Sequence, residues 1–198
     1  MVLDARRLKT VENVFGIEGA GFLLADILPP WLQDLNLVVE AVESGRPPGA
    51  PADWQPGAVI RLPFNNKLCR DGVVCAQALM AFADAAMMLA CAAAWSGYRP
   101  TNVIDQTIHF LRPVSFDVLA DARVVRIGRT TSFGRVMLSS AADRRPVGMV
   151  SSAYAMPTGR RSMALDSTTR PKLVARPMRT MRASASTSKC TGRRKCMV

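Results

Sequence analysis

The longest apolar stretch of the sequence covers residues 72–95, GVVCAQALMAFADAAMMLACAAAW, and contains a single acidic residue, Asp84. Ala, Leu and Met favour helices, and residues 73–95 contain neither Gly nor Pro. The pattern therefore predicts one long helix. A helix that is apolar on all sides is either a membrane span or the core of a folded domain. Gln77 and Asp84 inside the stretch argue against a membrane span, because an acid at the bilayer centre is costly.

Segments typical of strands lie on both sides of this helix. Two precede it and four follow it: 35–42, 59–66, 101–113, 118–128, 131–142 and 147–157. Short connections between the later segments predict antiparallel neighbours. Only one long helix is available to cover the apolar face of such a sheet. The sequence therefore predicts an α+β fold, in which an antiparallel sheet of five to six strands wraps around the helix.

The strand expected at 101–113 has period-two alternation, which assigns its side chains to two faces. The apolar face carries Ile104, Ile108 and Phe110. The polar face carries Asp105, Thr107 and His109, so the only histidine of the chain is expected to point outward or into an interface.

Composition divides the chain into three parts. Residues 1–30 form an N-terminal extension with short helices, 31–157 form the domain, and 158–198 form a basic tail that we expect to be disordered, because it holds few large apolar residues. The net charge of +11 belongs to the tail, since 1–157 holds 15 basic and 14 acidic residues. Nucleic-acid binding is therefore not expected of the domain. The basic clusters of the tail could bind nucleic acid or an acidic surface, or could remain solvated without a specific partner.

Cysteine and histidine usage limits the possible metal chemistry. The five cysteines match no zinc spacing, and one histidine excludes a zinc site built on two or three His ligands. The pattern favours free thiols in a reducing compartment, and no secretory signal is recognisable, so we expect a cytoplasmic protein.

Three segments, RLPFNNKLCRDG, ALMAFADAAM and TIHFLRPV, occur in an order and spacing that resembles a known family. Over residues 31–157 the chain is similar to the hotdog-fold acyl-CoA thioesterases of the phenylacetate-degradation type, in the 4-hydroxybenzoyl-CoA thioesterase-like superfamily. The resemblance implies a homo-oligomer, a dimer or a tetramer, in which the sheets of two chains join edge to edge. It also implies active sites at the dimer interface and no cofactor, since coenzyme A is part of the substrate.

The family signature is G-x-x-H-G-G, followed seven residues after its last Gly by a catalytic Asp or Glu. Counting back from Asp84 aligns the leading Gly with Gly72 and the HGG triplet with Cys75, Ala76 and Gln77. The resemblance thus implies that Asp84 activates water or attacks the thioester carbonyl. Backbone N–H groups at the helix start, at Ala76 and Gln77, would hold the oxyanion, and there any residue type can supply an amide.

Other residues have more than one interpretation. Arg112 and Arg123 could bind the phosphates of coenzyme A, or could be solvated strand and turn charges. Gln77 could orient water, or simply be a polar residue at a helix start. Cys75 could have a lowered pKa at a helix start, although no histidine near it in sequence would make it a nucleophile.

The expected function is hydrolysis of a short-chain or aromatic acyl-CoA. One alternative is a non-catalytic hotdog protein that binds acyl-CoA, suggested by the Cys-Ala-Gln triplet in place of His-Gly-Gly. A hotdog dehydratase is a second alternative, but His109 does not occupy the position that the dehydratase chemistry needs.

Overall fold

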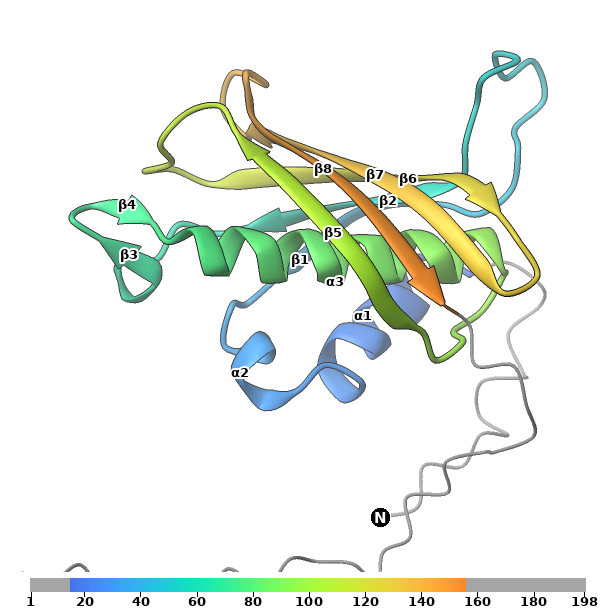
Figure 1. The fold of residues 1–198 in the computed structure, drawn as a ribbon, viewed down its shortest axis with the longest axis horizontal. Helices are drawn as coiled ribbons and strands as arrows, with labels where there is room; N and C mark the ends of the chain where they lie inside the picture. Colours follow the sequence, from blue (N-terminus) through green and yellow to red (C-terminus); the bar gives the residue numbers. More distant parts are fainter. Residues whose placement is uncertain (1–14, 156–198) are drawn as a thin grey trace, which may run out of the picture. The chain divides into compact units, whose positions relative to one another are not determined.

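An antiparallel sheet curves over one long helix in the computed structural model, which describes residues 15–155 (Figure 1). The sheet has six strands in the order β1-β2-β6-β7-β8-β5. In chain order the elements are α1 (Ile17–Asp26), α2 (Pro30–Gln33), β1 (Val38–Glu43), β2 (Gly57–Leu62), the 3-10 helix η2 (Asn66–Leu68), β3 (Cys69–Arg70), β4 (Val73–Val74), α3 (Ala76–Ala94), β5 (Asn102–Phe110), β6 (Val118–Ile127), β7 (Thr131–Ser140) and β8 (Pro146–Ala155). The predicted sheet and central helix are confirmed.

Helix α3 is shorter at its start than the apolar stretch predicted. Val73–Val74 form β4, which pairs with β3 in a small separate hairpin. Both residues of its two-residue turn have positive φ, 53° at Asp71 and 77° at Gly72. Asp-Gly favours this turn because such φ values suit hairpins with a right-handed twist. The turn chemistry outweighs the helix propensity of the apolar residues that follow it.

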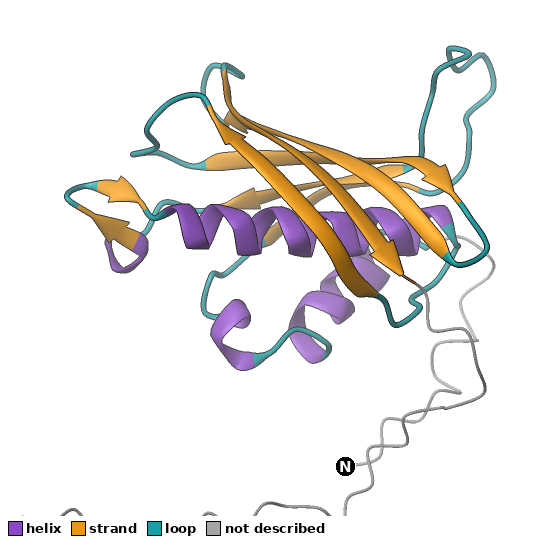
Figure 2. Cartoon of the chain, viewed as in Figure 1, coloured by secondary structure: helices purple, strands orange, loops and turns teal. Residues whose placement is uncertain are grey.

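The inner face of the sheet packs on α3 (Figure 2). Within the part of the chain that the structure describes, α3 is the only helix long and apolar enough to cross a bilayer, yet most of it is buried. Its buried residues are Leu79, Phe82, Ala83, Ala85, Ala86, Met87, Leu89, Ala90, Cys91, Ala92 and Ala93. Each large side chain among them contributes roughly 1.5–3 kcal/mol by burial. The first turn of the helix is different, because Ala76, Gln77 and Met80 are exposed.

Strand β5 forms one edge of the sheet and pairs only with β8. The short segment after β5 predicted an antiparallel neighbour in β6, and that prediction is wrong. The chain crosses to the other side of β7 and β8 before β6 begins, and β6 then pairs with β2 and β7. The crossing leaves one edge of β5 without a partner strand among residues 15–155.

A bulge in β5 also changes the predicted faces. The register with β8 shifts between Val103 and Asp105, so Ile104 has no partner in the ladder. Val103 lies opposite Tyr154 on the helix side, and Gln106 lies opposite Ser152 on the same side. Ile108 and Phe110 lie on the predicted face, whereas the assignment of Ile104 was wrong, because a bulge inverts the alternation.

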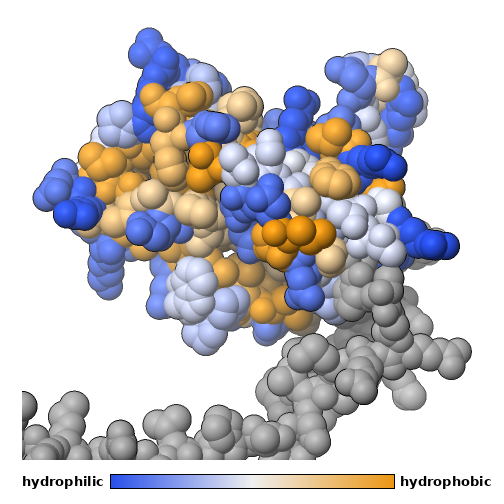
Figure 3. Space-filling model, in the orientation of Figure 1, coloured by the Kyte–Doolittle hydropathy of each residue, from blue (hydrophilic) through white to orange (hydrophobic). Residues whose placement is uncertain are grey.

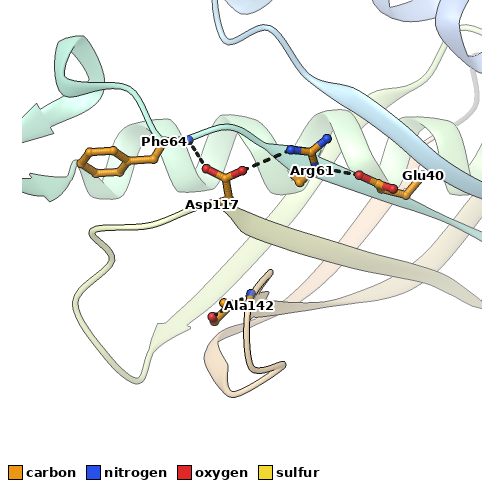
Figure 4. A network of polar contacts seen from close by, with 6 residues as sticks. Glu40, Arg61, Phe64, Asp117 and Ala142 are labelled. Carbon is orange, nitrogen blue, oxygen red and sulfur yellow. Dashed lines mark hydrogen bonds and ion pairs between the residues drawn. The ribbon is translucent and has the colours of Figure 1, made fainter.

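Polar side chains tie β1 and β2 to the start of β6 (Figure 4). Arg61 on β2 donates to Glu40 on β1 over 2.7 Å and to Asp117 over 3.2 Å. The other oxygen of Asp117 accepts from the backbone N–H of Phe64 over 2.8 Å. These bonds hold the chain where it leaves β2 and where it enters β6, and so fix the ends of the two strands that lie against α3.

Helices α1 and α2 lie on the side of α3 away from the sheet (Figure 1). Leu23 of α1 is almost fully buried, and α1 contacts both β1 and α3. The tail predicted at 158–198 and the first residues of the N-terminal extension lie outside the described residues.

Candidate functional site

The one acid of α3 is held by a tyrosine of the sheet. Asp84 is half-buried, and its Oδ1 accepts a hydrogen bond of 2.8 Å from the Oη of Tyr154 on β8. Burial raises the pKa of the Asp84 carboxyl, and the bond from Tyr154 partly offsets that rise by stabilising the charged form. An acid with a raised pKa in a folded core is typical of a general base or nucleophile.

Tyr154 itself is a fixed donor. It is 2% exposed and lies in the ladder between Ser132 of β7 and Val103 of β5. Burial and the neighbouring negative charge of Asp84 raise the pKa of the phenol far above its ordinary value. The hydroxyl therefore stays protonated and donates a hydrogen bond to the carboxylate. A buried tyrosine hydroxyl needs a partner, and here that partner is the acid.

Cys91 lies two turns after Asp84 on the same side of α3 and is buried. Burial and the charge of Asp84 raise the pKa of its thiol to about 12. A thiol in that state is a structural hydrophobe and not a nucleophile.

The start of α3 presents two backbone donors. Cys75 precedes the helix, and its own N–H donates to Leu68 O over 2.8 Å, while the N–H of Ala78 donates to Cys75 O over 3.1 Å. The N–H groups of Ala76 and Gln77 lie between them and have no acceptor among residues 15–155. Unpaired amides and the positive end of the helix dipole make this position suitable for an oxyanion.

A cavity of about 330 Å³ adjoins Ala76, the first of these donors. It is lined mainly by apolar side chains, with one charged residue: Val73, Val74, Ala76, Leu79, Phe110, Leu111, Arg112, Pro113 and Val114. Phe110 and Leu111 are 45% and 55% exposed, so apolar surface continues out of the cavity. Figure 3 shows apolar surface around the end of β5 and the start of α3. The cavity combines an apolar wall, the helix start at Ala76 and one guanidinium.

The structure brings some of the predicted site residues together and separates others. Ala76 and Arg112 line the same cavity. Asp84 follows Ala76 by eight residues on the same helix, which is about 12 Å along its axis. Gly72 lies in the turn of the β3–β4 hairpin, where its positive φ has a conformational role.

Arg123 lies away from Asp84, on the outer face of the sheet. Its guanidinium bonds Glu43 on β1 over 3.0 Å and Asp121 on β6 over 2.6 Å. Its neighbour Ala122 points to the opposite side, into the core against α3. The structure therefore does not place Arg123 with Arg112. The exposed His109 lies opposite Met149 on the outer face too.

Sequence reasoning missed two residues that contact the site. Tyr154 is one of only two tyrosines, at an inward position of the last strand, and an inward tyrosine signals a buried polar partner. Gln106 was assigned to neither face, yet its Nε2 donates to Met80 O over 3.1 Å and ties β5 to α3. Gln106 shares the helix side with Ile108 and Phe110 by alternation, but a polar residue there gave no signal of its backbone partner on α3.

No metal site is formed by the residues that the structure describes, because no three His, Cys, Asp or Glu side chains among residues 15–155 come together.

Comparisons with known proteins agree with this architecture. Residues 72–147 match the thioesterase superfamily. The chain is similar in structure to thioesterase superfamily member 2 of zebra fish, with 17% identity, a TM-score of 0.58, and coverage of 71% of this chain and 98% of that one. It is also similar to the PaaI protein of the Escherichia coli phenylacetic acid degradation operon, with 16% identity, a TM-score of 0.55, and coverage of 70% and 93%. A conserved protein of Pseudomonas aeruginosa has 22% identity, a TM-score of 0.55, and coverage of 66% and 95%. No curated protein matches the sequence significantly.

Proposed function

Because this chain has the hotdog fold and its central helix and sheet match the thioesterase superfamily, we propose that it hydrolyses the thioester of a short-chain or aromatic acyl-CoA. The single observation that carries the proposal is the pair of unpaired N–H groups, at Ala76 and Gln77, beside an apolar cavity. Acyl transfer needs donors aimed at the carbonyl oxygen, and a helix start supplies them without any particular side chain.

The cavity favours a small acyl group. Its volume of about 330 Å³ is at the lower end of the range of small-molecule sites. Phe110, Leu79 and Val114 would contact the acyl group, and Arg112 at the exposed side could bind a phosphate of coenzyme A.

Asp84 supplies the base in this proposal. Its carboxylate takes a proton from a water molecule, whose oxygen attacks the thioester carbon, and the negative charge moves to the carbonyl oxygen. Collapse of the intermediate breaks the carbon–sulfur bond, and the proton held by Asp84 passes to the leaving thiolate. Direct attack by the carboxylate, through an anhydride that water then hydrolyses, uses the same residue.

The catalytic unit contains two copies of the chain in this proposal. Ala76 and Asp84 lie about 12 Å apart along one helix axis, too far for both to contact one thioester carbonyl. The free edge of β5 offers a place for a second copy to pair, and Val103 and Ile104 are 45% and 58% exposed there. A twofold axis at this edge would bring the carboxylate of one copy toward the amides of the other.

One sequence feature favours a second candidate, a protein that binds acyl-CoA without hydrolysing it. Ala76 and Gln77 carry side chains where the family signature has glycines, and both side chains are exposed at the helix start. A Cβ at these positions narrows the approach of the thioester to the amides.

A panel of acyl-CoA thioesters, with release of free thiol followed spectrophotometrically, distinguishes the two candidates. Hydrolysis that is lost in Asp84→Ala and kept in Asp53→Asn supports the thioesterase, since Asp53 is an exposed acid in the loop between β1 and β2. Acyl-CoA binding by calorimetry with no thiol release would support the binding protein. Hydrolysis that is unchanged in Asp84→Ala would contradict the assigned role of Asp84.

A further inference from the structure

We propose that Tyr154 is a positioning residue, which fixes the Asp84 carboxylate through Oδ1 and leaves Oδ2 as the oxygen that acts on water or substrate. The kinetic part of this inference rests on the proposed thioesterase function. The bond and its coupling to the charge of Asp84 can be tested without any activity.

The rigidity of Tyr154 is the first part of the argument. Its backbone is bonded on both sides, in β8 between β7 and β5, and its side chain is 2% exposed. Asp84 lies on a different element, in the middle of α3. A hydrogen bond of 2.8 Å between a helix and a strand that pack together restricts the rotation of the carboxyl group to one orientation.

The choice of partner is the second part. Ser132 and Ser152 lie next to Tyr154 on the same inner face, and each is at least 95% buried. The Ser132 hydroxyl has no hydrogen-bond partner within residues 15–155, and the nearby Ser152 hydroxyl opposes the rise in the pKa of Tyr154 without accepting its proton. Neutral hydroxyls therefore lie close to Tyr154, yet its proton goes to the carboxylate. A charge-assisted bond is roughly twice as strong as a neutral one, so this pairing depends on the ionisation of Asp84.

Few other titratable groups lie close enough to Asp84 to change its ionisation. Cys91 on α3 is the only other titratable group of the described residues that interacts with this pair. The helix side of β5 carries Val103, opposite Tyr154, and Gln106, which is bonded to Met80 O, and neither side chain titrates. The inward positions of β6 and β7 opposite α3 carry Ala, Val, Leu, Gly and Ser, none of which titrates.

Substitution of the hydroxyl tests the positioning role. In Tyr154→Phe the charged form of Asp84 loses its donor, so the pKa of the Asp84 carboxyl rises. We expect the acid limb of the kcat/KM profile to move to higher pH and kcat to fall about tenfold, with little change in KM. The matched control is Tyr98→Phe, which removes the hydroxyl of the only other tyrosine, a half-buried one. A purely structural role would lower thermal stability and leave the acid limb unmoved.

A spectroscopic measurement covers the case in which Tyr154→Phe does not fold. Tyrosine labelled with ¹³C at Cζ gives one signal in Tyr98→Phe, and that signal belongs to Tyr154. We expect its chemical shift to follow pH with a single midpoint, as Asp84 gains its proton, and to become independent of pH over this range when Asp84→Asn is added. Two results would overturn the proposal. One is a chemical shift that does not change with pH in Tyr98→Phe, and the other is a chemical shift that still changes with pH after Asp84→Asn is added.

The two readouts separate the two claims. A Tyr154 signal that follows Asp84 in a protein without thioesterase activity would support the bond and contradict the proposed function. Thioesterase activity that needs Asp84, with an acid limb unmoved in Tyr154→Phe, would support the function and overturn the positioning role.

Discussion

The thioether of Met87 lies on the backbone of Gly134, in the space that a Cβ at that position would fill. Met87 is fully buried on α3, and Gly134 is an inward position of β7. The missing side chain lets the helix approach the sheet closely at this point. Asp84 precedes Met87 by one turn, so the same approach brings its carboxyl within hydrogen-bond reach of Tyr154 on the next strand.

Gly134→Ala tests this contact. The added Cβ would overlap the sulfur and methyl of Met87, and overpacking of a tight core costs about 1–3 kcal/mol. We expect a lower Tm by thermal unfolding and a weaker Asp84–Tyr154 pair. The double variant Gly134→Ala with Met87→Ala should lose less stability than the sum of the single variants, because the smaller side chain makes room. Additive losses would show that the two residues do not compete for space.

Asp84→Asn should remove activity and raise stability. We expect kcat to fall by about 10²–10⁴, since an amide cannot take a proton from water. Burial raises the pKa of Asp84 in the folded state, so its ionisation disfavours folding once the pH exceeds the unfolded value of about 3.9. The stability advantage of Asp84→Asn should therefore be absent in acid and should grow as the pH rises through the folded pKa.

Thermal unfolding of the original chain and of Asp84→Asn across this pH range measures the difference in their stability. Asp53→Asn is the control, because its carboxyl is exposed and its stability should track that of the original chain. An advantage for Asp84→Asn that is equal at every pH would contradict the raised pKa.

Activity should fall in acid with a midpoint above the ordinary range of an aspartate. The carboxylate must be ionised to take a proton, and burial raises its pKa in the free protein. The pH profile of kcat/KM for the best acyl-CoA substrate reports this value. A midpoint at or below about 3.9, the value of an unperturbed aspartate, would show that another group controls the acid limb.

Ala76→Pro removes one of the two proposed oxyanion donors. Proline has no N–H, but it is well tolerated at the first position of a helix. Cys75 before it has φ −61° and ψ 142°, a conformation that proline accepts in its predecessor. We expect kcat to fall about 10²–10³-fold with the fold intact by circular dichroism. Ala76→Val is the control, since it adds similar bulk and keeps the amide; an equal loss in both would attribute the effect to bulk.

Mixed dimers test whether the site is shared between two copies. Asp84→Ala and Ala76→Pro should each be inactive as homodimers. In a heterodimer, isolated with two different affinity tags, one of the two sites contains an intact Asp84 and an intact Ala76 amide from opposite chains. We expect about half of the original activity. A silent heterodimer would show that both groups must come from the same chain.

Much of the fold could be predicted because the local signals agree with it. The apolar stretch around Asp84 predicts a long helix, and the strand segments on either side predict a sheet that needs that helix as its core. The errors have local causes. The Asp71–Gly72 turn forms a hairpin that delays the start of α3, and the bulge between Val103 and Asp105 inverts the faces of the residues before it. Neither feature changes the composition of its segment.

In the candidate site, too, some features follow from the sequence and others only from the tertiary structure. By itself the sequence determined one long helix around Asp84 and the order of the strands before and after it, because these depend on residue type and spacing along the chain. The start of that helix at Ala76 was set by the turn before it. Only the tertiary structure decided the partners. Tyr154 is 70 residues from Asp84 in sequence, and Arg112 reaches the cavity of Ala76 only through the crossing after β5. It also separated Arg123 from Arg112, because alternate residues of a strand face opposite sides of the sheet and ion pairs hold Arg123 on the outer one. Contacts of this kind depend on strand order and register, which the pairing of distant segments sets and which local patterns do not encode.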